Sequence, residues 1–246
     1  MEVITIAARK GGDGKTTTAH NVGAGLMRKG KKVLYIDLDT QKNLTRRLAS
    51  LEAEKTIVDA LQAKTVKEIR QTETRLTDNS SLIAGALAIA VYEKDNAQKG
   101  NIEIVGEILK AFEGQFDYVI IDTAANFGLM TLAGLKAADK IIITMQASAD
   151  SLQGVQSLNA VIDDVRAGND KPEVVGILPT MWKTRNITNT ILDFTKEWAA
   201  SEGLRVLEPI RDCIAIQEAE LVQQDIFEYS GKCKAAADYQ KLIDIL

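Results

Sequence analysis

The sequence predicts an α/β protein with a doubly wound, mostly parallel sheet and helices on both faces. Short runs rich in Val and Ile recur along the chain, and apolar residues fill them almost without interruption. Strands that are buried on both faces of a parallel sheet have this composition. Segments with apolar residues at helical spacing lie between the runs, and the alternation of strand and helix is typical of doubly wound sheets.

The individual elements follow from the same two patterns. Helices are predicted at 16–28, with Gly30 as the stop signal, and at 151–166. Residues 63–80 are polar, and we expect them at the surface. Six segments are predicted as strands: 2–8, 32–37, 117–122, 140–145, 173–178 and 204–209.

Length and composition indicate one domain in a reducing compartment. The 246 residues contain no linker rich in Pro or Ser, so we expect a single domain spanning 1–246. The two cysteines, Cys213 and Cys233, form no CxxC motif, which argues against a disulfide or a zinc site and favours the cytoplasm. The net charge of −4 gives no overall attraction to nucleic acid or to an acidic membrane, so any such binding requires a local basic patch.

A phosphate-binding loop is predicted where the first strand meets the first helix. The stretch ARKGGDGKTTT, residues 8–18, resembles the GxxxxGK[ST] pattern in the strand–loop–helix context that a P-loop requires. In such a loop Lys15 contacts the β- and γ-phosphates and the Thr16 hydroxyl binds Mg²⁺. Three glycines let the backbone N–H groups point at phosphate oxygens: Gly11, Gly12 and Gly14.

One lysine of this stretch has no evident use within the loop. Lys10 lies five residues before the motif lysine, and Arg9 occupies the place of the first glycine in the ordinary pattern. The loop itself needs a single lysine, so the sequence raises the question of what Lys10 contacts.

Acidic residues end two of the predicted strands. Asp122 follows YVII, and Asp37 follows VLYI with Asp39 two residues later. The carboxyl ends of parallel strands meet at one edge of the sheet, where the phosphate loop also lies. Asp122 therefore takes the place of a Walker B aspartate, which holds Mg²⁺.

Together these motifs resemble the ParA/MinD group of P-loop ATPases, and their combination favours ParA. KGGDGKTT resembles the deviant Walker A motif KGGxGKT[TS], and DLDTQKN resembles the DxDPQxN switch segment. YVIIDTAANFGLMTLAGLKAAD resembles the ParA Walker B region, and DIFEYSGKCKAAADYQKL resembles the C-terminal segment. The resemblance runs from residue 2 to near the end, is weakest at 63–100, and corresponds to the small form without an N-terminal DNA-reading domain.

The resemblance implies an ATP- and Mg²⁺-dependent enzyme that works as a homodimer. Lys10 matches the signature lysine that reaches the nucleotide of the other subunit, where it acts like an arginine finger. Asp39 would activate the attacking water, and Lys15 completes the catalytic set. Thr16 would bind Mg²⁺ directly, with Asp37 and Asp122 holding it through water. The expected nucleotide site comprises Gly11, Gly12, Asp13, Gly14, Lys15, Thr16, Thr17, Met181 and Pro209.

Three departures from the family pattern concern the same site. Asp13 stands where the family has a small apolar residue, and its carboxylate weakens nucleotide binding unless it points away or meets a cation. Thr40 and the pair Ala124 and Ala125 replace prolines, which predicts looser loops and different ATP turnover. None of these changes removes a catalytic group.

The ParA resemblance further implies DNA partition. The ATP-bound dimer would bind DNA without sequence specificity at the bacterial nucleoid, and a ParB-like centromere-binding protein would stimulate hydrolysis. Ala215 stands where relatives carry an arginine, which weakens this prediction. A ParA-like ATPase that positions protein cargo and a MinD-like membrane ATPase are the alternatives, and the non-basic end ADYQKLIDIL disfavours membrane binding. The candidate DNA contacts are Lys183, Arg185, Arg211, Lys232 and Lys234.

Overall fold

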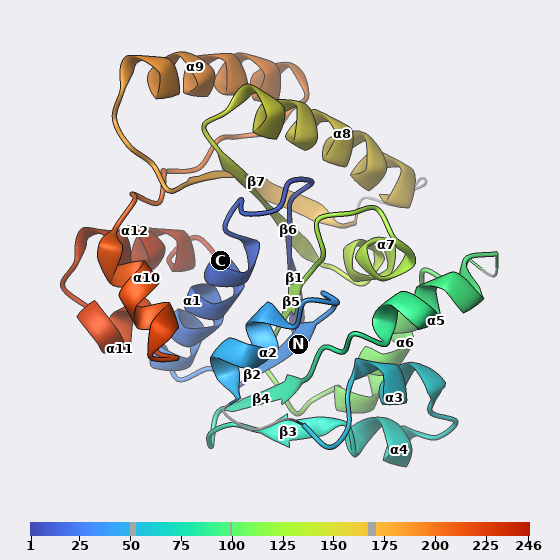
Figure 1. Ribbon diagram of the computed structural model, residues 1–246. Helices are drawn as coiled ribbons and strands as arrows, with labels where there is room; N and C mark the ends of the chain where they lie inside the picture. The colour runs from blue at the N-terminus through green and yellow to red at the C-terminus, as the bar shows by residue number, and fades with distance from the viewer. Residues whose placement is uncertain (50–52, 99, 167–170) are drawn as a thin grey trace.

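A seven-stranded, mostly parallel sheet forms the centre of the molecule (Figure 1), as predicted. The computed structural model describes residues 1–49, 53–98, 100–166 and 171–246. The strand order is β3-β4-β2-β5-β1-β6-β7, and the β3–β4 pair is antiparallel. The strands are β1 (Glu2–Ala7), β2 (Val33–Asp37), β3 (Glu73–Arg75), β4 (Ser80–Ile83), β5 (Tyr118–Asp122), β6 (Lys140–Gln146) and β7 (Glu173–Thr180).

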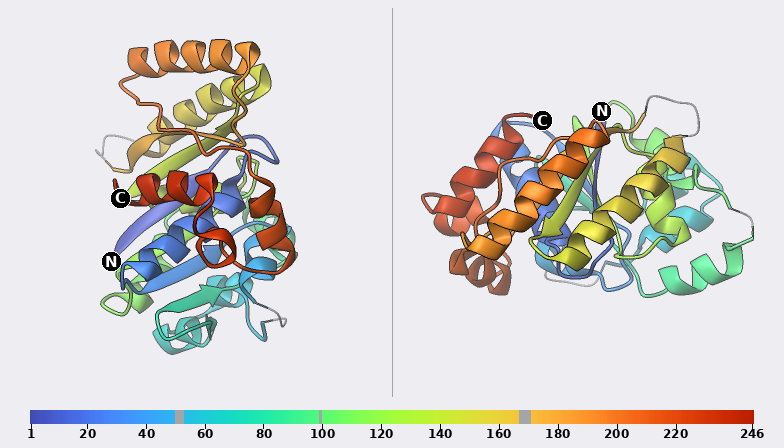
Figure 2. Two further views of the ribbon diagram at one scale, coloured as in Figure 1. Left: turned by 90° about the vertical axis from the view of Figure 1, so that its left-hand side faces the viewer. Right: turned by 90° about the horizontal axis from the view of Figure 1, so that it is seen from above.

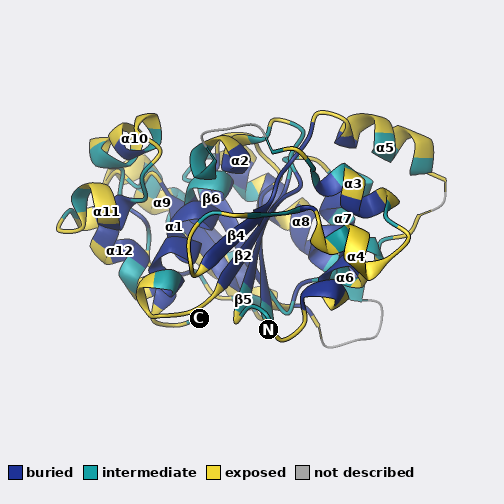
Figure 3. Ribbon diagram, turned by 90° about the horizontal axis from the view of Figure 1, so that it is seen from below, coloured by how far each residue is buried: buried dark blue, intermediate teal, exposed yellow. Residues whose placement is uncertain are grey.

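Helices cover both faces of this sheet (Figures 1 and 2). The core on one face packs strand side chains against α1, α11 and α12, and the core on the other face packs them against α3, α6, α7 and α8. Figure 3 shows the strands as a buried layer between the two groups. The helices are α1 (Lys15–Arg28), α2 (Asn43–Leu48), α3 (Ile57–Gln62), α4 (Val66–Arg70), α5 (Ile89–Asn96), α6 (Ile104–Leu109), the 3₁₀ turn η1 (Lys110–Phe112), α7 (Leu129–Lys136), α8 (Ala149–Arg166), α9 (Asn186–Ser201), α10 (Ile214–Leu221), α11 (Ile226–Ser230) and α12 (Lys234–Ile243).

The prediction of a strand at 204–209 is wrong. This segment runs beside β7, but Val206 makes only an isolated parallel bridge with Ile177. Pro209 has no N–H to donate, and Pro179 on the facing strand has none either, so the regular ladder is interrupted, and the next hydrogen bond runs from the Ile210 amide to the Pro179 carbonyl at 2.8 Å. The segment therefore belongs to the connection between α9 and α10.

Two strands at the opposite edge of the sheet were missed. Residues 63–80, expected as polar surface, contain α4 and β3, and β4 begins at their last residue, Ser80. All four residues of β4 are buried, but the strand begins with two serines and lacks the Val- and Ile-rich run that marked the other strands. β3 is a three-residue edge strand and carries no apolar signal at all.

Helix α1 begins at the phosphate loop and passes through the core. Its N-cap, Gly14, has a left-handed backbone with φ of 80°, and the helix ends at Arg28 before Gly30, the predicted stop, with φ of 78°. Gly23 lies so close to Tyr35 that a Cβ atom there would come within 2.3 Å of the phenol oxygen. The glycine thus lets α1 approach β2 closely.

None of the described helices combines the length and the apolar character that crossing a membrane would require.

We predict that Gly23→Ala lowers the free energy of unfolding by about 1–3 kcal/mol, because the new methyl group overlaps the ring of Tyr35. Gly106→Ala in α6 is the matched control. Apart from its chain neighbours and the nearby backbone of its own helix, no heavy atom lies within 4 Å of the Cβ position at Gly106. This control should gain about 0.5–1 kcal/mol from helix propensity. Urea unfolding checks both, and equal stability of the two variants would contradict the packing argument.

Candidate functional site

The loop between β1 and α1 has the geometry of a phosphate cradle. Gly12 and Gly14 both have positive φ, at 86° and 80°, a conformation that side-chain-bearing residues rarely adopt. No side chain caps the N-terminus of α1, so its first N–H groups remain available to an anion. A Cβ atom on Gly14 would come within 3.2 Å of Thr180, which also favours glycine at this position.

The ends of β6 and β7 hold this loop from behind. The Gln146 side-chain amide donates to the carbonyl of Gly12 at 2.8 Å. The Thr180 hydroxyl lies within hydrogen-bond distance of the Asp13 carbonyl, at 3.0 Å, and of the Met145 carbonyl, at 3.2 Å. The backbone of the loop is therefore fixed before any ligand arrives.

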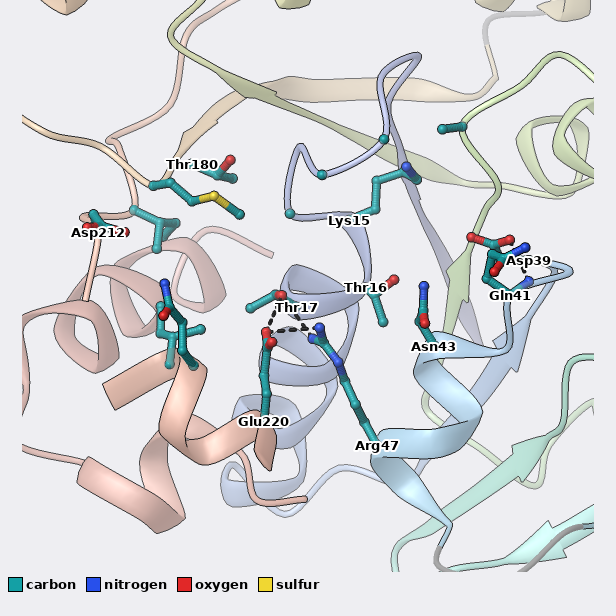
Figure 4. A pocket seen from close by; sticks show the side chains of 18 of the residues that line it. Lys15, Thr16, Thr17, Asp39, Gln41, Asn43, Arg47, Thr180, Asp212 and Glu220 are labelled. Carbon is teal, nitrogen blue, oxygen red and sulfur yellow. Dashed lines mark hydrogen bonds and ion pairs between the residues drawn. The ribbon is translucent and has the colours of Figure 1, made fainter. Parts of the chain in front are cut away.

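A cavity of about 520 Å³ opens in front of the loop, between α2 and α10 (Figure 4). A cavity of this size suits a nucleotide-sized ligand. Pro209 is absent from its lining, and the adjacent Ile210 takes its place. The other predicted nucleotide contacts that line it are Gly11, Gly12, Gly14, Lys15, Thr16, Thr17 and Met181.

The side chain of Asp13 is turned away from this cavity. It is buried, and its Oδ1 accepts a hydrogen bond from the Ser151 hydroxyl at the start of α8, at 3.1 Å. Burial raises the pKa of this carboxyl, while Ser151, Lys10 and Lys15 oppose the rise. From the sequence we expect Asp13 to weaken nucleotide binding unless its carboxylate points away from the phosphates. The structure has the carboxylate pointing away.

Asp37 and Asp122 lie at the same level of neighbouring strands, because β2 and β5 pair these two residues directly. Both are fully buried. Asp37 Oδ2 accepts hydrogen bonds from the amide and the hydroxyl of Thr45, at 2.9 and 2.8 Å, and Oδ1 accepts one from the amide of Asp39. The Asp37 carboxylate thereby ties the end of β2 to the start of α2.

Neither carboxylate oxygen of Asp122 has a hydrogen-bond partner among the described residues. Burial raises the pKa of Asp122, and the charge of Asp37 raises it further. The nearby Thr16 hydroxyl lowers the pKa, but its geometry falls short of a regular hydrogen bond. A buried, unpartnered carboxylate needs a cation or water on its oxygens.

These residues fit a hydrated Mg²⁺ ion. The described residues contain no cluster of three or more His, Cys, Asp or Glu side chains that could enclose a metal by themselves. Mg²⁺ keeps several waters and is bound through few protein ligands and substrate phosphates, so a closed cluster is not needed. Thr16 lines the cavity, and the unpartnered oxygens of Asp122 can accept hydrogen bonds from metal-bound water.

Asp39 borders the cavity, whereas Lys10 contacts the start of α8. Asp39 lines the cavity and its Oδ1 accepts from the amide of Gln41 at 2.9 Å. Lys10 is not among the lining residues. Its Nζ lies 3.4 Å from the Ser148 hydroxyl and 3.8 Å from the Asp150 carboxylate, both at the start of α8, and its side chain is 43% exposed.

The five predicted DNA contacts do not form one uncompensated basic patch. Lys183 pairs with Asp212 at 3.0 Å, and Arg211 pairs with Asp238 at 2.6 Å. Three of the five are exposed without an ion pair among the described residues: Arg185, Lys232 and Lys234.

Sequence reasoning missed three charged residues of the cavity lining, which are Arg47, Asp212 and Glu220. Arg47 in α2 and Glu220 in α10 contact each other and Thr17 across the first turn of α1 (Figure 4). They are 173 positions apart (220 − 47) and belong to no motif. The only sequence signal was the position of Arg47 just after the switch segment, which is too weak to assign a contact.

The chain is similar to known partitioning ATPases over nearly its whole length. A protein-family model described as an AAA domain matches residues 1–174. The chain is 30% identical to the chromosome-partitioning ATPase Soj of Treponema pallidum, covering 98% of this chain and 95% of that protein. It is 29% identical to the chromosome partitioning protein ParA of Myxococcus xanthus, covering 98% and 86%. The structure of a Cyanothece McdA variant in complex with ATP has the same fold, with a TM-score of 0.90, 22% identity and coverage of 100% and 96%.

We predict that Asp122→Asn stabilises the chain at pH 7 when Mg²⁺ and nucleotide are absent, by about 1 kcal/mol or more. Because the pKa of Asp122 is raised, the folded chain keeps a proton that the unfolded chain releases above its ordinary pKa of 3.8. Wild-type stability therefore falls as the pH rises from about 4 towards neutrality, and the neutral amide removes part of this slope.

Urea unfolding at several pH values measures this effect. Asp193→Asn on the exposed surface of α9 is the control and should leave the slope unchanged. If Asp122→Asn has the wild-type slope and stability, folding does not raise the pKa of Asp122.

Proposed function

The chain belongs to the AAA domain family and, within it, to the ParA/Soj partitioning ATPases, and we propose that it hydrolyses ATP in a homodimer that moves DNA. The ATP-bound dimer binds DNA without sequence specificity, and a ParB-like partner that recognises a centromere stimulates hydrolysis. The observation that carries this proposal is the different placement of two lysines in the phosphate loop. Lys15 lines the cavity of its own subunit, whereas Lys10 is directed away from it.

The residues of the cavity support a phosphoryl-transfer reaction. The N–H groups of the phosphate loop and Lys15 bind the phosphates, and Thr16 holds Mg²⁺. When bound, Mg²⁺ neutralises charge on the β- and γ-phosphates. Asp39, whose carboxylate borders the cavity, orients the attacking water. Asp37 is held by Thr45 and Asp39 and keeps the switch segment in register with Asp122.

Lys10 supplies its charge to the second subunit. Its own-subunit contacts are weak, because the separations of 3.4 and 3.8 Å are long and the side chain is 43% exposed. A lysine in this setting exchanges partners at small cost when an ATP-bound subunit docks on the same face. Hydrolysis then requires the dimer, since the transition-state charge is stabilised only when the partner's lysine arrives.

DNA binding would depend on the exposed basic residues that carry no ion pair among the described residues, namely Arg185, Lys232 and Lys234. Arg185 lies immediately before α9, Lys232 lies in the turn between α11 and α12, and Lys234 is the first residue of α12. Non-specific affinity needs several such charges facing phosphates, and dimerisation doubles their number.

The second candidate is an ATPase that positions protein cargo. The observation in its favour is that carboxylates neutralise Lys183 and Arg211, so two of the five expected DNA contacts are already engaged. A MinD-like attachment to membranes is disfavoured by α12. This helix buries Ala236, Tyr239 and Leu242 in the core and presents no free apolar face.

Mixed dimers test the role of Lys10 in the partner's site. Lys10→Ala should bind ATP and lose stimulated hydrolysis, and Asp39→Ala should also bind ATP without hydrolysing it. A heterodimer of the two contains one composite site with its own Asp39 and the partner's Lys10 both intact. We predict that mixing the variants restores partial ATPase activity. Verified heterodimers that stay as inactive as either variant alone would show that Lys10 acts within its own subunit or not at all.

Filter retention of unrelated duplex DNA tests the DNA-binding proposal. We predict that Arg185→Glu weakens ATP-dependent retention and leaves basal ATPase activity intact. Binding by the wild type should fall steeply with salt, with a slope of about −0.9 in log K against log salt for each phosphate neutralised. Lys67→Glu in α4, an exposed position at the other end of the sheet, is the control for the charge change. Absence of retention by the wild type at low salt, with a slowly hydrolysed ATP analogue, would favour protein cargo.

A further inference from the structure

The nucleotide cavity contains a cation that the phosphate-loop motif does not explain. Three basic residues line the cavity: Lys15, Arg47 and Arg211. Lys15 is the motif lysine. Arg211 is engaged elsewhere, because its Nε and Nη2 donate to the two carboxylate oxygens of Asp238 at 2.7 and 2.6 Å. Arg47 is the remaining cation of the lining.

Arg47 lies against the first turn of α1. Its Nη1 donates to the Thr17 hydroxyl at 2.9 Å, although it belongs to α2. Thr17 follows Lys15 and Thr16, which bind the β- and γ-phosphate side of a nucleotide in a phosphate loop.

On the other side of Thr17, Glu220 lies one turn along α10 from Ile216. Ile216 belongs with Met181 and Ile210 to the apolar part of the lining, which suits a base. Thr17 therefore lies between the base side and the β- and γ-phosphate side, at the level expected for the α-phosphate.

Glu220 fixes the guanidinium at this level. Its Oε1 accepts a hydrogen bond from the Thr17 hydroxyl at 2.7 Å and pairs with Arg47 Nη2 at 2.9 Å. The side chains of Arg47 and Glu220 are only 18% and 31% exposed, so both are held in a partly desolvated place. Two N–H groups of Arg47 are used in these contacts, and a guanidinium has five donors.

The charges explain why the three residues belong together. A lone carboxylate at the level of the α-phosphate would repel the nucleotide, because both groups are anionic and little water separates them. Arg47 cancels the charge of Glu220 and has donors left for a phosphate oxygen, which a planar fork binds well. With Arg47 present the pair is neutral and offers free N–H donors to a phosphate, and without Arg47 it leaves a carboxylate that repels the phosphate.

We propose that Arg47 binds the α-phosphate of the nucleotide and that Glu220 and Thr17 position its guanidinium. The inference rests on the proposed ATPase function and adds a contact on the base side of the phosphate loop. It also links the ligand to α2, whose Thr45 holds Asp37, and to α10, which carries Glu220.

Calorimetric titration of the full chain with ATP, ADP and AMP tests this contact, with AMP measured in competition against ADP. Arg47→Ala should weaken all three by a similar factor, roughly 10- to 100-fold, the loss expected for one charge-assisted hydrogen bond. Arg46→Ala is the matched control. Arg46 is exposed, lies on the same helix and is absent from the lining of the nucleotide cavity.

The double variant Arg47→Ala/Glu220→Gln separates binding from fold stability. It should recover part of the affinity lost in Arg47→Ala, because the unpaired carboxylate is gone. A pair that only stabilises the fold would instead lower the melting temperature in either single variant and leave nucleotide affinity unchanged. Arg47→Gln, which is uncharged and retains a long polar side chain, serves if the alanine variant does not fold.

Three results would overturn the proposal. Arg47→Ala, or Arg47→Gln where that variant is used, could bind nucleotides as tightly as the corresponding Arg46 variant. It could lose affinity for ATP but not for AMP, which would move the contact to the γ-phosphate side. The double variant could bind no better than Arg47→Ala. A wild-type chain that binds no nucleotide would overturn the proposed function instead, and the same titration detects this first.

Discussion

The direct pairing of Asp37 with Asp122 on neighbouring parallel strands is the constraint on which the site depends. Two carboxylates at one level of a buried sheet repel each other and lose hydration. The fold compensates Asp37 with three hydrogen bonds from Thr45 and Asp39, and those bonds shape the segment that borders the cavity. It leaves Asp122 uncompensated within the described residues. The unpartnered carboxyl group of Asp122 thus lowers the folding stability of the chain, and a hydrated cation bound beside it would restore that stability.

Hydrogen bonding to a buried carboxylate also explains how the phosphate loop tolerates an acidic residue. Asp13 is one residue from Gly14, whose backbone opens α1, yet its carboxylate reaches the hydroxyl of Ser151 behind the loop. The hydrogen bond, together with Lys10 and Lys15, lowers the pKa that burial raises. The acidic side chain is therefore part of the support of the loop, and the backbone in front of it keeps its positive potential.

The sequence predicted those elements whose signal lies within a short stretch of consecutive residues. Five of six strands, both named helices and most of the phosphate loop follow from apolar runs, helical spacing and glycines, because each signal lies within a few consecutive residues. β3 and β4 have no apolar run, and 204–209 has one but also a proline that cannot donate to β7. Arg47 and Glu220 meet only through the tertiary fold, so no local pattern could pair them.

The arrangement of charges around the cavity separates two kinds of basic residue. Lys183 and Arg211 each lie beside a carboxylate at 3.0 Å or less, and such pairs keep a side chain in one place. Lys10 lies 3.8 Å from its carboxylate partner, a weaker contact that costs little to break. A protein that changes partners during a cycle needs weakly paired cations where subunits or DNA must bind. It needs tightly paired cations where the cavity must keep its shape. The strength of each ion pair therefore separates cations that can exchange partners from cations that stay in place. Arg47, paired with Glu220 at 2.9 Å, stays in place and would bind phosphate through the donors that this pair leaves free.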